Sequence, residues 1–114
     1  MTEPVELIVE QHNSATIVRL AGEIDLSTAA DTRSRIEQST GGATHVVLDL
    51  GGLTYLDSAG LAMVDGLARR CRGQGLAFGV VAPEESVVRT VLAVSGLDNV
   101  VAVHATDSDA LSAP

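Results

Sequence analysis

The residues whose chemistry stands out most lie in the stretch T-Y-L-D-S-A-G-L, residues 54–61, where an acid, a hydroxyl and two small residues follow an apolar, strand-forming run. At the start of a helix, the oxygen of Ser58 could cap free backbone N–H groups, and the local sequence alone favours this use because serine is among the commonest caps. An exposed Ser58 hydroxyl could instead accept a phosphate, which free N–H groups and the helix dipole stabilise by about 0.3–2 kcal/mol. Ala59 and Gly60 would then leave room for another protein's active site, and Asp57 would favour a phosphate that points outward.

Catalysis by these residues is disfavoured. Asp25 and Asp57 could form a pair of catalytic carboxylates, but two acids are weak evidence in so acidic a chain. The sequence around Ser58 is D-S-A-G rather than the G-x-S-x-G of a nucleophile elbow, and no base for the serine is evident. We therefore expect a protein that is not an enzyme.

Asp49 ends an apolar run, as does the phosphorylated aspartate of response-regulator receivers. A receiver also needs an acidic pair after its first strand and a late lysine, and all seven basic residues of this chain are arginine. We expect Asp49 to bind backbone N–H groups of its loop instead.

The histidines and the cysteine do not indicate a metal site. His12, His45 and His104 lack partners at zinc-ligand spacing. Cys71 is the only cysteine and falls on an apolar helical stripe, which predicts a buried, inert thiol. We expect neither a metal nor a cofactor.

The composition restricts the partners. A net charge of -8 repels phosphate backbones and anionic lipid, so nucleic acid and membranes are unfavourable partners. Only 2% of the residues are aromatic, so stacking on bases is disfavoured as well. Glu3 and Glu6 stand where a signal peptide would carry positive charge, and no apolar run approaches the ~18 residues of a membrane span. With one cysteine, these features predict a cytoplasmic protein.

Hydrophobic periodicity predicts the elements that hold these residues. The sequence predicts a single α/β domain over residues 1–114, with its core at roughly 5–104. An opening hairpin is followed by strand–helix alternation, which gives a mixed central sheet with packed helices. The predicted strands are residues 5–11, 15–20, 45–50, 76–82 and 100–104, and the helices start near residues 28, 58, 83 and 106.

Several helix boundaries follow from local signals. Thr28 and Asp31 match a capping box, and Pro83 with two acids suits a first helical turn that ends before Gly96. The residues following Thr106 suit a short terminal helix behind another capping box. From Ser58 onward, one buried helical stripe is predicted, made of Leu61, Val64, Leu67, Ala68 and Cys71.

Three segments in order resemble the anti-sigma factor antagonist family of the STAS-domain superfamily. L-A-G-E-I-D-L-S-T-A (20–29) resembles the family's segment between its second strand and first helix. V-V-L-D-L-G-G-L-T-Y-L-D-S-A-G-L-A-M-V (46–64) resembles its signature strand, loop and helix start. V-V-R-T-V-L-A-V-S-G-L-D-N-V-V (87–101) resembles its third helix and last strand. The resemblance covers nearly the whole chain.

The resemblance implies a regulatory function. Unphosphorylated, such a protein binds an anti-sigma factor, often itself a serine kinase, and so releases the sigma factor. Phosphorylation of the signature serine, here Ser58, switches binding off, and a serine phosphatase reverses it. Ala59 replaces a second serine seen in many members, so Ser58 is the only hydroxyl in the D-S-A-G-L helix start of the signature. The expected partner-binding residues are Asp25, Leu26, Ser27, Thr54, Asp57, Ser58, Ala59, Leu61 and Ala62.

Two alternatives remain open. The chain could be a STAS-type scaffold or accessory subunit of a signalling or lipid-transport complex that binds without being phosphorylated. It could also be an enzyme or small-ligand binder that uses the loop around Asp25 and Asp57, which the scarcity of aromatic residues, histidine and lysine argues against.

Overall fold

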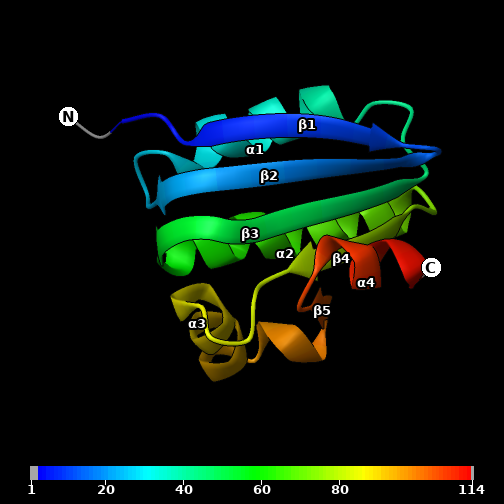
Figure 1. Ribbon diagram of the computed structural model, residues 1–114. Coiled ribbons are helices and arrows are strands. Elements are labelled where there is room, and N and C mark those ends of the chain that lie inside the picture. Colours follow the sequence, from blue (N-terminus) through cyan, green and yellow to red (C-terminus); the bar gives the residue numbers. More distant parts are fainter. Residues whose placement is uncertain (1–2, 114) are drawn as a thin grey trace.

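The computed structural model describes residues 3–113, in which strands and helices alternate after an opening hairpin (Figure 1). In chain order the elements are β1 (Glu6–His12), β2 (Ala15–Ile24), α1 (Ala29–Ser39), β3 (His45–Leu56), α2 (Ser58–Gly73), β4 (Ala77–Val81), α3 (Val87–Ser95), the 3-10 helix η1 (Leu97–Asn99), β5 (Ala102–His104) and α4 (Asp107–Ser112). The predicted order of elements is confirmed.

The strands of the described residues form one mixed sheet in the order β1-β2-β3-β4-β5. β1 runs antiparallel to β2, and the other neighbouring pairs are parallel. The hairpin turns through Asn13, whose φ of 56° is a left-handed conformation that asparagine tolerates. The predicted mixed α/β sheet is therefore confirmed.

The helices divide between the two faces of the sheet. In Figure 1, α1 and α2 lie behind the sheet and α4 lies in front of it. The main core lies between the sheet and the helices behind it. It includes Leu48 and Val80 of the sheet, Val64 of α2 and Leu92 of α3. A smaller cluster on the other face packs Ala110 of α4 against the middle strands. The middle of β3 is buried from both sides, as its apolar run predicts.

Several predicted boundaries were wrong. β2 continues past Leu20 to Ile24, and β5 begins at Ala102 instead of residue 100. β3 does not stop at Leu50 but continues to Leu56, because Gly52 lets the strand pass the neighbouring backbone. A Cβ at Gly52 would lie 2.7 Å from the carbonyl oxygen of Leu20. α3 begins at Val87, not near Pro83, because the Ser86 side chain caps it by accepting from the Arg89 N–H at 3.1 Å.

The predicted capping boxes had different outcomes. Thr28 precedes α1, but its side chain makes no capping bond; it accepts instead from the Asp25 N–H at 3.0 Å. That expectation was wrong because the preceding loop uses the hydroxyl. Thr106 does cap α4, where its side chain accepts from the Asp109 N–H at 3.1 Å.

Within residues 3–113, no helix has the length and apolar character needed to cross a bilayer.

Candidate functional site

Ser58 is the first residue of α2 and is exposed, but it is not the helix cap. The Asp57 carboxylate takes that role, accepting from the Ala59 N–H at 2.9 Å and the Gly60 N–H at 3.2 Å. The capping interpretation of Ser58 was therefore wrong, and two of the N–H groups expected to be free for a phosphate are occupied by Asp57. The Asp57 carboxylate accepts from the N–H groups of Ala59 and Gly60, and the Ser58 hydroxyl takes no part in the cap.

Ala59 and Gly60 do not play the same part. Ala59 is partly exposed, whereas Gly60 is buried and faces the ends of β2 and β3. A Cβ on Gly60 would lie 2.2 Å from Leu56 Cδ1 and 3.1 Å from Ile24 Cγ2. The expectation that Gly60 leaves room for a visiting protein was wrong, because its missing side chain lets α2 pack closely on the sheet.

The loop after β2 lies beside the start of α2. The Asp57 N–H donates to the Ile24 carbonyl at 3.2 Å, which joins the two strand ends. Asp25 then turns the chain, and its Oδ1 accepts from the Ser27 hydroxyl at 2.6 Å and the Ser27 N–H at 2.9 Å. These bonds lower the pKa of Asp25 and keep it charged. Leu26, at the tip of the turn, is 85% exposed.

The other predicted partner-binding residues flank this point. Thr54 is exposed near the end of β3, where its hydroxyl donates to the Gly22 carbonyl at 3.3 Å. Ala62 is exposed one turn along α2 from Ser58. Leu61 is only partly exposed and packs against the main core, so it contributes more to folding than to the surface.

Two hollows flank the exposed side of α2, and the sequence analysis missed both. One, of about 250 Å³, lies between α1 and α2 and is lined by Ala29, Ala30, Arg33, Ala59, Ala62 and Met63. The other, of about 330 Å³, lies toward α3 and is lined by Leu61, Ala62, Asp65, Arg69, Ser95, Gly96, Leu97 and Val100. Small residues at the start of both helices were the available signal, but their meeting depends on how the helices pack.

An acidic hollow of about 460 Å³ lies on the other side of the Asp25 loop. Its lining includes the side chains of Glu3, Glu6, Glu23 and Asp25. Tyr55, at the end of β3 and 47% exposed, is a further surface residue that the sequence analysis did not select. Its position directly before Leu56 and Asp57 was the signal that could have identified it.

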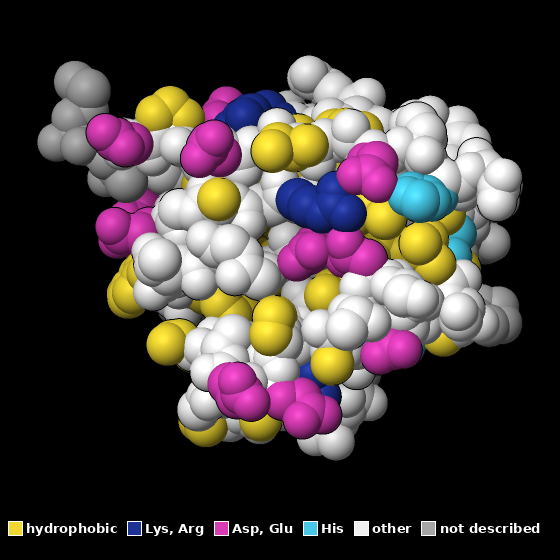
Figure 2. All heavy atoms as spheres, viewed as in Figure 1, with side chains coloured by type: hydrophobic (Ala, Val, Ile, Leu, Met, Phe, Trp, Pro, Cys, Tyr) yellow, Lys and Arg dark blue, Asp and Glu magenta, His cyan; other side chains and the backbone are white. Residues whose placement is uncertain are grey.

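Asp49 accepts from a backbone N–H group as predicted, that of Gly51 at 2.8 Å, but Gly51 belongs to β3 and not to a loop. It also lies beside Arg19, which binds Glu10 and, at 2.6 Å, the Asp107 carboxylate at the start of α4. Burial and the neighbouring Asp107 raise the pKa of Asp49 to about 6. Figure 2 shows acidic side chains spread over this face, with one small basic area near its centre that acidic side chains enclose. The ion pairs of Arg19 with Asp49 and Asp107 hold α4 on the sheet, and they are separate from Ser58.

The cysteine, the possible metal ligands and the Asp25–Asp57 pair show no arrangement suited to catalysis or metal binding among the described residues. Cys71 is buried, and burial raises the pKa of its thiol. The described residues contain no grouping of His, Cys, Asp and Glu side chains suited to a metal ion. The carboxylates of Asp25 and Asp57 are each engaged by backbone N–H groups, which reduces their availability as a catalytic pair.

A parallel sheet with an antiparallel first strand, and a D-S-A-G segment that opens a helix after the central strand β3, define the class of protein. The chain belongs to the STAS domain family, whose sequence profile matches residues 6–110. This finding confirms the predicted family and fold.

Named relatives make the assignment more specific. The chain is 34% identical over 111 residues to the anti-sigma-F factor antagonist RsfB of Mycobacterium tuberculosis, covering 96% of this chain and 89% of RsfB. It is 29% identical over 116 residues to RsfA of the same organism, covering 99% and 90% of the two chains. An anti-sigma factor antagonist from Mycobacterium paratuberculosis has a similar structure, with a TM-score of 0.86, 29% identity and coverage of 99% and 97%. All three of these relatives are named as anti-sigma factor antagonists.

Proposed function

We propose that this chain is an anti-sigma factor antagonist that binds an anti-sigma factor when Ser58 carries no phosphate, and so releases the sigma factor. The observation that supports this most is the exposed Ser58 at the first position of α2, outside a cap that Asp57 supplies. The hydroxyl is accessible to a kinase, and no rearrangement of the helix is needed to reach it.

The proposed docking surface surrounds this serine and is called the Ser58 surface. It consists of Asp25, Leu26, Ser27, Thr54, Asp57, Ser58, Ala59, Leu61 and Ala62. Leu26 offers an exposed apolar side chain, and the alanines of α2 line shallow hollows into which a partner's side chains fit. In this proposal the partner groups that meet Ser58 are apolar or acidic, because a basic group there would attract the added phosphate and strengthen binding.

Phosphorylation acts in this proposal by local repulsion. A phosphoserine adds about -1.5 to -2 charges, here directly after Asp57 and near the loop of Asp25. Asp57 already occupies two N–H groups of the first turn, so the phosphate lacks these donors and points outward. Like charge facing a docked partner costs several kcal/mol, or a loss of roughly two to three decades in affinity.

The proposed partners follow from this chemistry. A serine kinase, which can be the anti-sigma factor itself, adds the phosphate to Ser58, and a serine phosphatase removes it. The setting expected for such a cycle is the cytoplasm, and neither nucleic acid nor a membrane is proposed as a partner.

The direct test is to measure the affinity of three variants for the cognate anti-sigma factor by calorimetry. Ser58→Asp should bind roughly a hundredfold more weakly than the unmodified protein, and Ser58→Ala should bind as tightly. Ser108→Asp is a matched control, because Ser108 is exposed on α4, on the other face of the sheet. Similar affinities for Ser58→Asp and Ser58→Ala would reject the switch and favour the scaffold alternative.

A further inference from the structure

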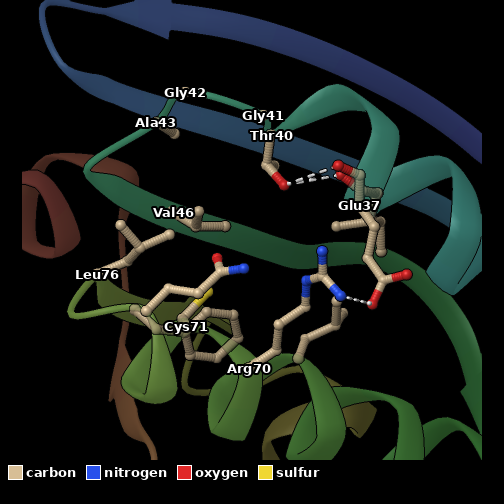
Figure 3. Close-up of a pocket in the computed structure, with 13 residues that line it drawn as sticks. Glu37, Thr40, Gly41, Gly42, Ala43, Val46, Arg70, Cys71 and Leu76 are labelled. Atoms are coloured by element: carbon tan, nitrogen blue, oxygen red, sulfur yellow. Dashed lines mark hydrogen bonds and ion pairs between the residues drawn. The ribbon is translucent and has the colours of Figure 1, made fainter.

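A cavity lies at the opposite end of α1 and α2 from the Ser58 surface (Figure 3). It is formed by the last turns of both helices, the loop after α1 and the starts of β3 and β4, and its volume is about 310 Å³. Cys71 lines it 13 positions after Ser58, so at the ~1.5 Å rise per residue of a helix the two sites are about 20 Å apart. The lining includes both polar and apolar groups, and the volume exceeds the ~150 Å³ of an apolar cavity that holds benzene, so this cavity can hold a small molecule.

The inner wall of the cavity is apolar. Val46, Leu67 and Cys71 are buried residues that line it, and Phe78, the only phenylalanine of the chain, is partly exposed there. They come from β3, α2 and β4, so the wall is formed by packed elements of the fold and not by a mobile loop. Such a wall suits an aliphatic chain.

The mouth of the cavity is locally basic. Glu37 and Arg70 line the mouth, where the Arg70 guanidinium lies 3.7 Å from the Glu37 carboxylate (Figure 3). Arg33, which lies outside the cavity lining, donates to the same carboxylate at 3.2 Å. Two positive charges and one negative charge leave a local excess of +1 in a chain of net charge -8.

Arg70 has N–H donors that make no hydrogen bond to Glu37. Its contact with Glu37 is too long for a hydrogen bond, and its side chain is 53% exposed. Glu37 keeps its hydrogen bond from Arg33, so Arg70 can bind a second anion without leaving that carboxylate unpaired.

We propose that this cavity binds a small amphipathic monoanion, such as a medium-chain carboxylate, with its chain on Val46, Leu67 and Phe78 and its head group on Arg70. One free guanidinium matches one negative charge, whereas Glu37 repels a polyanion such as a nucleotide. The volume and the single aromatic ring disfavour a base and sugar as well. This inference is independent of the function proposed for Ser58.

The test is an NMR titration of the full chain with octanoate, using octanamide as the uncharged probe. Octanoate should shift the amide signals of the cavity residues saturably and bind roughly tenfold more tightly than octanamide. Arg70→Gln should remove that preference. Arg69→Gln is the matched control, because Arg69 is 73% exposed and pairs with Asp65 instead; it should bind octanoate as the unmodified protein does.

A second variant tests the apolar wall. Cys71→Met puts a longer side chain into the cavity and should abolish saturable binding of octanoate while the amide spectrum stays that of a folded protein. The proposal is overturned if octanoate shifts signals all over the surface, if no saturation is reached, or if Arg70→Gln and Arg69→Gln bind it equally. These arginine variants decide the question even if Cys71→Met does not fold.

Discussion

Replacing Gly60 by alanine tests how the fold positions Ser58. The new Cβ would lie 2.2 Å from Leu56 Cδ1 and 3.1 Å from Ile24 Cγ2, and these neighbours are only 5% and 0% exposed. Overpacking of this kind costs about 1–3 kcal/mol. The alanine regains about 1 kcal/mol of helix propensity, so we expect a net loss of up to about 2 kcal/mol in the free energy of unfolding.

The assay is urea denaturation, with Gly73→Ala as the matched control. Gly73 is the last residue of the same helix, and a Cβ there would have no neighbour within 4 Å. That variant should be unchanged or more stable by about 0.4–1 kcal/mol, so the two substitutions should have opposite signs. If Gly60→Ala is as stable as Gly73→Ala, the close packing of α2 on the strand ends is not what requires the glycine.

Two further predictions concern carboxylates. The pKa of Asp49 is raised from 3.8 to about 6, so the folded state holds its proton more tightly than the unfolded state and stability falls as the pH rises through that window. Asp49→Asn should flatten this fall and stabilise the protein above pH 6, measured by urea denaturation on either side of the window; an unchanged slope would contradict the assignment. Asp57→Ala should cost about 0.5–2 kcal/mol through loss of the cap, whereas Asp57→Asn should cost little because asparagine caps equally well. Equal losses in thermal unfolding would mean that the charge, not the cap, matters.

The order of the elements was predictable because each has a clear local signal. The alternation of apolar runs with helical stripes identified the strands and helices, and Gly96 ends α3 in the left-handed conformation that glycine favours. The bond from the Gly51 N–H to Asp49 was predictable as a local bond from backbone to side chain, although both residues lie within β3 and not in a loop.

The failures share a physical cause, which is competition between neighbouring residues of similar propensity. Asp57 and Ser58 are both good cap residues, and the bond from the Asp57 N–H to Ile24 is a tertiary contact that a local pattern cannot include. Gly52 is typical of the end of a strand, yet β3 continues through it. Glycine is needed there because a side chain would collide with the Leu20 carbonyl. Gly60 is a similar case, because glycine is required there only by the close packing of α2 on the strand ends.

The candidate site was partly predictable. The register of β2 against β3 brings the Asp25 loop beside Asp57, as the order of the segments suggested. The hollows flanking α2 and the cavity at its far end were not predictable, because each joins residues of two or more elements that come together only in the packed fold.

The most direct test of the central claim is calorimetry of the cognate anti-sigma factor with two forms of the natural chain, differing only in a phosphate that mass spectrometry maps to Ser58. The account predicts tight binding of the unphosphorylated form and a loss of roughly a hundredfold or more in the phosphorylated form, because the added charge faces the partner beside Asp57. Equal affinities, with the phosphate confirmed on Ser58, would contradict it.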